Sequence, residues 1–192
     1  MADFLATLEF ENWYVHFLVP QNPEGRDQCI EPGEYEDAFE HLWLNALYQR
    51  YGVDIQEAPH FRRYVYEREG NYQVPRDDPA WSPFRRARSG LNDGKGMLFI
   101  SSIGRICPSE QLPLAAGQYP HADVVEVYRN SELFKALRDP GNLKGRCREC
   151  EYHDICGGSR SRAYRLTGDY FASEPDCYNV AFGKEPPVPY RT

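Results

Sequence analysis

The chain has 192 residues, enough for one sizeable hydrophobic core or for two small ones joined by a linker. Hydrophobic residues make up 41% of the sequence and aromatic residues 14%, which is typical of a folded globular protein and excludes general disorder. The formal net charge of -7 argues against nonspecific binding to nucleic acid.

The first twenty residues, MADFLATLEFENWYVHFLVP, lack the basic region of a secretory signal peptide. No segment approaches the roughly 20 apolar residues that a membrane-spanning helix needs. We therefore expect a cytoplasmic protein with no membrane partner, in a compartment that keeps thiols reduced. Clustered cysteines in such a protein favour metal binding or redox catalysis over structural disulfides.

The first third of the chain predicts a strand, a helix and a second strand. NWYVHFLVP (12–20) is rich in aromatic and β-branched residues, as strands are. PGEYEDAFEHLWLNALYQRYG (32–52) places its apolar residues on one helical face, with Gly52 as a plausible stop. VDIQEAP then reads as a short strand closed by Pro59. Such a βαβ unit normally belongs to a larger parallel sheet, so we expect an exposed apolar sheet face and open strand edges.

A long irregular segment separates this unit from the rest of the chain. HFRRYVYER (60–68) predicts a short helix or a strand extension. Residues 71–96 are rich in Gly, Pro, Asp and Arg and show no apolar period, which predicts a linker or functional loop.

The last part of the chain predicts a hairpin followed by short helices. MLFISS and GRIC form the hairpin, which turns near Ile103 and Gly104. ADVVEVYRN and SELFKALRD are two short helices, the second capped by Ser131. A further helix is expected over about 159–167, ended by Gly168.

Four cysteines in this part have the spacing of metal ligands. Cys147, Cys150 and Cys156 follow the pattern C-x2-C-x5-C within CRECEYHDICGGSRSR, and Cys177 lies twenty-one residues further on in SEPDCYN. Four thiolates suit either a tetrahedral zinc ion or a [4Fe-4S] cluster. The spacing alone leaves both metals open.

The surroundings of these cysteines favour an anionic metal centre over a pair of disulfides. Gly157 and Gly158 let the backbone approach a bulky inorganic core and leave amides free to bond to it. Residues 141–170 carry six Lys and Arg against four Asp and Glu, a net charge of +2 in an acidic chain. A [4Fe-4S] cluster with four thiolates carries a charge of about -2 when oxidised, so this segment complements it. Arg160, Arg162 and Arg165 either surround the cluster or offset nearby acids.

The cysteine segment, CGGSRSRAYRLTGDYFASEPDC in particular, resembles the SPASM-type C-terminal domain of radical SAM proteins. It is most similar to the subgroup with porphyrin-modifying members. ISSIGRICPSEQLPL resembles the opening hairpin of that domain, and LVPQNPEGRD with the following helix is similar to the last βαβ unit of the radical SAM partial barrel. The resemblance implies an α+β fold, with a barrel remnant over 1–70, a linker over 71–96 and a SPASM-type iron–sulfur domain over 97–192.

The resemblance also implies which cluster is present. Two-cluster members of the family carry ligands at positions that correspond here to Ser109 and Arg160, so one of the two auxiliary clusters is expected to be absent. The four ligands implied for the other are Cys147, Cys150, Cys156 and Cys177. Full cysteine ligation leaves no open iron, which implies electron transfer or structural support.

The catalytic motif of the family is missing from this sequence. Radical SAM enzymes hold their catalytic cluster with C-x3-C-x2-C, and no cysteines here have that spacing. We therefore expect that this chain alone neither binds nor cleaves S-adenosylmethionine. The sequence leaves open a natural short form, a split subunit or a truncated reading frame. The expected partner is a separate radical SAM catalytic half or a second copy bound through the barrel edge.

Three more residues have a possible role. Cys107 is expected to be either a plain buried residue of the hairpin or a displaced ligand, and Cys29 is expected to be incidental. His60 follows the second strand, where α/β proteins often bind ligands, but a packing or capping role is the favoured interpretation. The alternative function for the whole chain is a zinc-stabilised interaction domain without a redox role.

Overall fold

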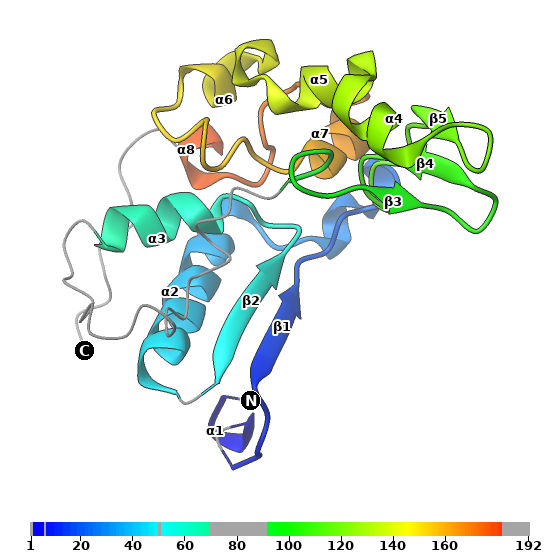
Figure 1. Cartoon of the computed structure of the whole chain (residues 1–192). Coiled ribbons are helices and arrows are strands. Elements are labelled where there is room, and N and C mark those ends of the chain that lie inside the picture. Colours follow the sequence, from blue (N-terminus) through cyan, green and yellow to red (C-terminus); the bar gives the residue numbers. More distant parts are fainter. Residues whose placement is uncertain (1, 6, 50, 70–91, 182–192) are drawn as a thin grey trace.

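The computed structural model describes residues 2–5, 7–49, 51–69 and 92–181 (Figure 1). They form helices and two small sheets. The first part comprises α1 (Ala2–Leu5), β1 (Asn12–His16), the 3-10 helix η1 (Pro23–Gln28), α2 (Pro32–Tyr48), β2 (Gly52–Gln56) and α3 (Phe61–Glu69). The second part comprises β3 (Phe99–Ile100), β4 (Arg105–Cys107), β5 (Gly117–Gln118), α4 (Val124–Asn130), α5 (Glu132–Arg138), the 3-10 helix η3 (Pro140–Asn142), α6 (Gly145–Glu149), α7 (Arg160–Thr167) and α8 (Tyr178–Ala181).

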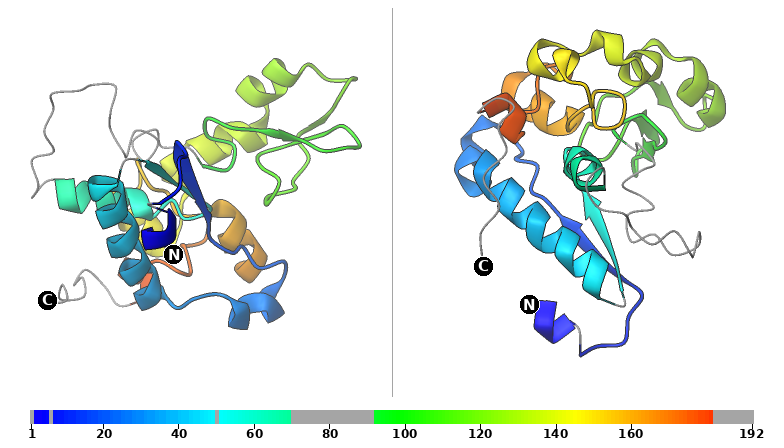
Figure 2. Two further views of the ribbon diagram at one scale, coloured as in Figure 1. Left: turned by 90° about the horizontal axis from the view of Figure 1, so that it is seen from below. Right: turned by 90° about the vertical axis from the view of Figure 1, so that its left-hand side faces the viewer.

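The first part contains the predicted parallel strand–helix–strand unit. β1 and β2 pair in parallel, with Trp13 opposite Val53 and Val15 opposite Ile55. The helix α2 begins at a capping box between Glu31 and Glu34 and runs alongside the two strands (Figure 2). Of the two alternatives that the sequence left for residues 60–68, the structure has the helix, α3, over Phe61–Glu69.

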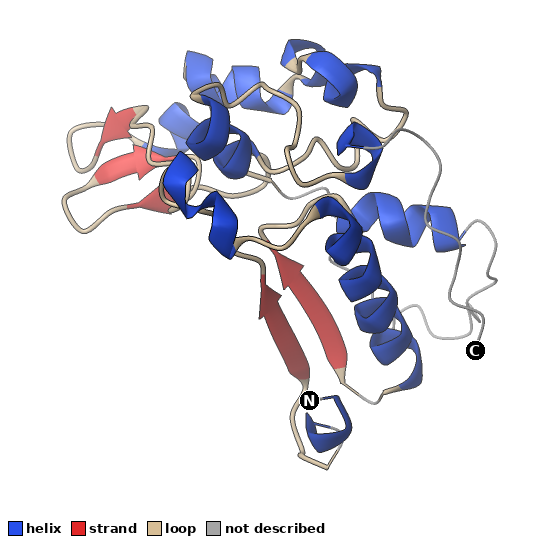
Figure 3. Ribbon diagram, turned by 180° about the vertical axis from the view of Figure 1, so that it is seen from behind, coloured by secondary structure: helices blue, strands red, loops and turns tan. Residues whose placement is uncertain are grey.

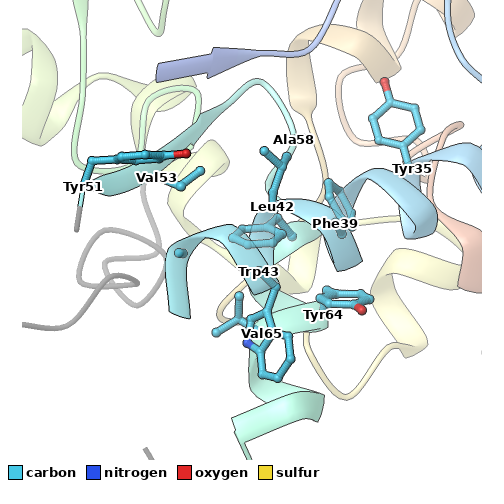
Figure 4. Packing of buried hydrophobic residues seen from close by; sticks show 11 residues of the cluster. Tyr35, Phe39, Leu42, Trp43, Tyr51, Val53, Ala58, Tyr64 and Val65 are labelled. Atoms are coloured by element: carbon cyan, nitrogen blue, oxygen red, sulfur yellow. The ribbon is translucent and has the colours of Figure 1, made fainter. Parts of the chain in front are cut away.

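The main hydrophobic core lies between the sheet, α2 and α3. Figure 4 shows the side chains of α2 meeting those of α3 and β2. Phe39 is fully buried, and its ring packs edge-on against Phe61 and Tyr64 of α3 at 5.2 and 5.8 Å between centroids. The remaining buried members of this core are Tyr35, Leu42, Trp43, Ala46, Tyr51, Val53, Ala58 and Val65.

The helix α2 ends earlier than its sequence predicts. Its last residue is Tyr48, and Gln49 closes it by donating its backbone N–H to the carbonyl of Asn45 at 2.9 Å. Gly52 is instead the first residue of β2, where a Cβ atom would collide with the side chain of Asn12. The glycine therefore serves the close approach of the two strands and does not end the helix.

The face of the sheet opposite α2 is mainly polar. Side chains alternate along a strand, so this face carries those that do not point towards the helices. They are Asn12, Tyr14, His16, Asp54 and Gln56. Tyr14, 49% exposed, is the large hydrophobic residue among them. The expectation of an exposed apolar face is therefore wrong for the described residues.

The second part begins with the predicted hairpin. β3 and β4 pair antiparallel and turn at Gly104, whose φ is 81°. β5 adds a third strand to this sheet, which the sequence did not predict because Gly117 and Gln118 carry no strand signal. Asn92 and Lys95 form a tight turn just before the hairpin, whereas residues 71–91 of the predicted linker lie outside the described residues.

The short helices of the second part largely match the prediction. Ser131 begins α5 as expected, although its side chain makes no capping hydrogen bond. Gly168, with a φ of 78°, ends α7 as expected. The second part lies beyond the carboxyl ends of β1 and β2, at the far end of the sheet from α1 (Figures 1 and 3). None of the described helices is long and apolar enough to cross a membrane.

Candidate metal centre

The four cysteines with ligand spacing line one cavity of about 160 Å³. Cys147 lies in α6, Cys150 is the residue that ends this helix, and Cys156 follows in the next turn. Cys177 immediately precedes α8. All four are free thiols, and Cys147 and Cys177 are each 8% exposed. The helix α6, the turn that follows it and the segment before α8 thus bring the four predicted ligands to one cavity. Among the described residues, no three Cys, His, Asp or Glu side chains form a ready-made site for a single metal ion.

Two of the sulfur atoms accept hydrogen bonds from backbone amides. Gly158 donates its N–H to Sγ of Cys156 at 3.4 Å, and Glu174 donates its N–H to Sγ of Cys147 at 3.2 Å. The first contact needs the left-handed turn of Gly157 and Gly158, whose φ values are 67° and 64°. Such bonds orient metal-binding thiolates and stabilise their negative charge.

Burial in the cavity raises the pKa of three of these thiols. The pKa of Cys156 rises to about 12 because the buried thiolate loses its hydration, and the pKa values of Cys147 and Cys177 rise for the same main reason. A buried thiolate needs a compensating positive charge, which a metal centre supplies. Binding such a centre here must therefore release protons.

The two positions where a second cluster would find its ligands hold hydrogen-bonding side chains instead. Arg160 is 2% exposed and donates to the carbonyls of Gly158, Tyr170 and Ala172 at 3.2, 2.9 and 2.7 Å. Ser109 is 4% exposed and accepts from the backbone N–H of Leu112 at 3.0 Å. Arg160 thus joins the turn at Gly158 to residues 170–172, and Ser109 fixes a local turn that leads to Leu112.

Two contributors to the site escaped the sequence analysis. Asn92 donates from Nδ2 to the carbonyls of Cys156 and Gly158 at 3.2 and 2.6 Å, and so holds the glycine turn from outside. Arg63 of α3 lines the cavity from the first part of the chain, where it is paired with Glu36. Both lie more than sixty residues from the cysteines that they approach, and neither belongs to a recognisable motif.

The other cysteines and His60 lie outside the cavity. Cys107 is a buried residue of β4, and Cys29 lies with Sγ 3.9 Å from the carbonyl of Gly25. His60 is fully buried, with its ring 4.8 Å from that of Tyr35 and 4.9 Å from that of Phe39. Its position fits packing in the core.

Known proteins similar to this chain include enzymes named as heme synthases, a pre-heme d1 synthase and peptide cyclases. The AdoMet-dependent heme synthase of Methanosarcina barkeri is 32% identical over 167 residues, which cover 86% of this chain and 47% of that enzyme. The pre-heme d1 synthase of Dinoroseobacter shibae is 51% identical over 99 residues, or 50% of this chain and 24% of that enzyme. The PqqA peptide cyclase of Bradyrhizobium diazoefficiens is 30% identical over 90 residues, or 44% and 24%.

The matches to heme synthases cover most of this chain but only part of each relative. No family model matches the chain. The chain spans about half the length of the heme synthases that it matches. These relatives are radical SAM enzymes, and the chain is homologous to the heme synthases over 86% of its own length and to the other two enzymes over half of it or less.

Proposed function

We propose that this chain binds one [4Fe-4S] cluster through Cys147, Cys150, Cys156 and Cys177, as an auxiliary cluster-binding module of a radical SAM protein. The observation that carries the proposal is the shared cavity that these four thiols line. Iron–sulfur clusters of this type are held by four cysteine thiolates, and such a cluster supplies one-electron transfer when bound. The two amide-to-sulfur hydrogen bonds and the left-handed glycine turn fit the same group.

The proposed module serves electron transfer or structural support, and does not cleave S-adenosylmethionine on its own. With all four ligands from the protein, no iron position is left for a substrate. The six cysteines of this sequence contain no C-x3-C-x2-C motif. In this proposal β1, α2 and β2 correspond to the last βαβ unit of a radical SAM partial barrel, and residues 97–192 correspond to the SPASM domain.

The wider setting of the module is proposed from its relatives. The longest matches are to enzymes named for heme synthesis, so we propose that the cluster serves a reaction in the formation of a heme-type compound. We propose that the catalytic cluster comes from a separate radical SAM catalytic half. The alternative partner is a second copy of this chain, bound along the open edges of β1 and β2. We place this assembly in the cytoplasm, with neither nucleic acid nor membrane as a partner.

Substitution of single cysteines tests the ligand set. The expected result is that Cys147→Ser, Cys150→Ser, Cys156→Ser and Cys177→Ser each lower the iron bound after anaerobic reconstitution to less than half of the wild-type amount. Serine keeps the size of the side chain but is a poor ligand for this cluster. Iron and acid-labile sulfide per chain are the quantities to measure.

Cys29→Ser and Cys107→Ser are the matched controls, because both cysteines lie outside the cavity. They should retain the wild-type iron content. Equal iron loss in the controls and in the four ligand variants would remove the basis of the proposed ligand set. A zinc-stabilised interaction domain, the alternative function, would lose zinc in the same four variants and would contain no iron.

A further inference from the structure

A buried group of four charged residues joins the two parts of the molecule beside the cysteine cavity. Arg26 belongs to η1 and Arg162 to α7, while Glu174 and Asp176 lie in the segment that leads to Cys177. The side chains of Arg162, Glu174 and Asp176 are fully buried, and that of Arg26 is 32% exposed. Two positive and two negative charges therefore face one another, three of them fully shielded from water and the fourth in part.

Arg162 lies at the centre of this group. Its Nη1 lies 3.2 Å from Oε1 of Glu174, and its Nε lies 2.9 Å from Oδ2 of Asp176. Its remaining nitrogen, Nη2, donates to the carbonyl of Leu18 at 3.0 Å, just beyond β1. The guanidinium of Arg162 thus contacts two carboxylates of the second part of the chain and, in the first part, the backbone just beyond β1. A planar group with several fixed donors suits this task, and an ammonium does not.

The first part of the chain contacts one of these carboxylates, that of Asp176, through two further side chains. Arg26 pairs with Oδ1 of Asp176, and the hydroxyl of Tyr35 donates to Oδ2 of Asp176 at 3.1 Å. Tyr35 belongs to the aromatic core of α2, where its ring stacks on Phe17 with 4.9 Å between centroids. The position of Asp176 is therefore set by residues of the first part of the chain.

The segment that carries these two carboxylates also positions the sulfur atoms of Cys177 and Cys147. The side chain of Glu174 accepts the backbone N–H groups of Ser159 and Asp176, the latter at 3.2 Å, which fixes the turn before Cys177. The backbone N–H of Glu174 donates to Sγ of Cys147 at 3.2 Å. Displacing this turn would move the Cys177 thiol and weaken the hydrogen bond to the Cys147 sulfur.

We infer that Arg162 is a positioning residue for the metal centre, which acts through Glu174 and Asp176 and makes the placement of Cys177 depend on the βαβ unit. The inference rests on the proposed iron–sulfur function. A hydrogen bond to a ligating sulfur favours the reduced, more negative state of a cluster, and so does a nearby positive charge. Loss of either shifts the midpoint reduction potential to more negative values.

The test compares Arg162→Lys with Arg165→Lys in the full-length, reconstituted protein. Arg165 lies on the same helix and donates to the carbonyl of Gln21 at 3.3 Å, but has no contact with either carboxylate in the described structure. Both variants keep the charge, and only Arg162→Lys removes the bridging geometry. We expect a more negative midpoint potential and altered electron paramagnetic resonance g-values for Arg162→Lys, and wild-type values for Arg165→Lys.

A second arm keeps the test decisive if Arg162→Lys does not fold. Arg26→Gln removes a partly exposed charge on the βαβ side of the group and should also shift the potential to more negative values, with Arg165→Gln as its control. Wild-type potential and g-values in Arg26→Gln, together with either wild-type values or no folding in Arg162→Lys, would overturn the inference. If the wild-type protein binds no iron–sulfur cluster, the proposed function itself fails, which is a different result.

Discussion

At the scale of single residues, His60 shows how burial controls charge in the core. Its ring lies between Tyr35 and Phe39, and neither ring nitrogen has a hydrogen-bond partner in the described structure. Burial lowers the pKa of His60 well below its usual value of 6.5, and the nearby positive charges of Arg162 and Arg63 lower it further. The folded protein therefore keeps this histidine neutral.

This environment predicts a loss of stability in mild acid. Below pH 6.5 His60 binds a proton in the unfolded chain but stays neutral in the folded one. The free energy of unfolding therefore falls as the pH falls. The loss attributable to His60 is about 1.4 kcal/mol per pH unit until the folded-state pKa is reached. Urea unfolding between pH 7.5 and 5.5 measures it, as the difference between the wild-type protein and His60→Phe.

His41→Gln is the control, because His41 is exposed on α2. It should follow the pH dependence of the wild-type protein, whereas His60→Phe should be less sensitive to acid. Parallel pH profiles of the wild-type protein and His60→Phe would show that His60 is not held neutral in the folded state.

The residues of the metal centre were predictable to different degrees. Cys147, Cys150, Cys156 and Cys177 could be found from spacing because short turns bring nearby ligands together. The amide of Glu174 and the side chain of Asn92 could not be found, since their contacts depend on the folded path of the chain. The different contacts of Arg160 and Arg162 could not be predicted for the same reason. Arg160 donates to backbone carbonyls, whereas Arg162 pairs with carboxylates.

At the scale of elements, two left-handed glycines have different surroundings. Gly168 ends α7 with a φ of 78°, and a Cβ atom there would meet no atom within 4 Å. Gly158 has a φ of 64°, and a Cβ atom there would lie 2.7 Å from Cβ of Glu174 and 3.5 Å from Sγ of Cys147. A Cβ atom strains the backbone at both positions, but of these two glycines only Gly158 also has a steric conflict.

The pair gives a matched test of the glycine turn. Gly168→Ala should lower the free energy of unfolding by about 1 kcal/mol, the cost of a left-handed alanine, and leave the iron content unchanged. Gly158→Ala should lower the iron content as well, because Glu174 and its hydrogen bond to Cys147 must move. Iron analysis and urea unfolding of both variants provide the measurement. Full iron content in Gly158→Ala would contradict this role for the turn.

The elements themselves follow from the sequence except where tertiary contacts override local signals. The parallel pairing, the hairpin and the helices α2, α4, α5 and α7 follow their patterns, whereas β1 ends at His16 and β2 at Gln56, before the ends of the strands predicted over 12–20 and 53–59. The end of α2 did not, because Gly52 is needed where β2 passes Asn12. β5 was missed because two residues without strand propensity pair only through their neighbour β4.

At the scale of the whole molecule, the buried charged group makes the two parts interdependent. Arg26 and Arg162 bind the same carboxylate of Asp176 from η1 and α7, and removing one partner would leave a buried charge uncompensated. Such a junction differs from a flexible linker between independent domains. The two parts should therefore unfold together.

Two signals within the protein can follow the two parts separately. In a Trp81→Phe background, fluorescence reports Trp13 and Trp43 of the βαβ unit, and visible absorbance reports the cluster. We expect both signals to change at one urea midpoint, and both midpoints to fall together in Arg26→Gln. Two well-separated transitions would show that the parts fold independently.

The polar outer face of the βαβ sheet also bears on assembly. Asn12, His16 and Gln56 make the exposed part of this face polar, which favours recruitment of a partner along the open strand edges over recruitment through an apolar face. This distinction could not be made from the sequence alone, because the register of β1 against β2 decides which side chains share a face.

The most direct test of the central claim is the metal content of the protein purified under anaerobic conditions, measured together with its visible spectrum. The account predicts a brown protein with about four irons and about four sulfides per chain. A colourless protein with one tightly bound zinc ion per chain would contradict it.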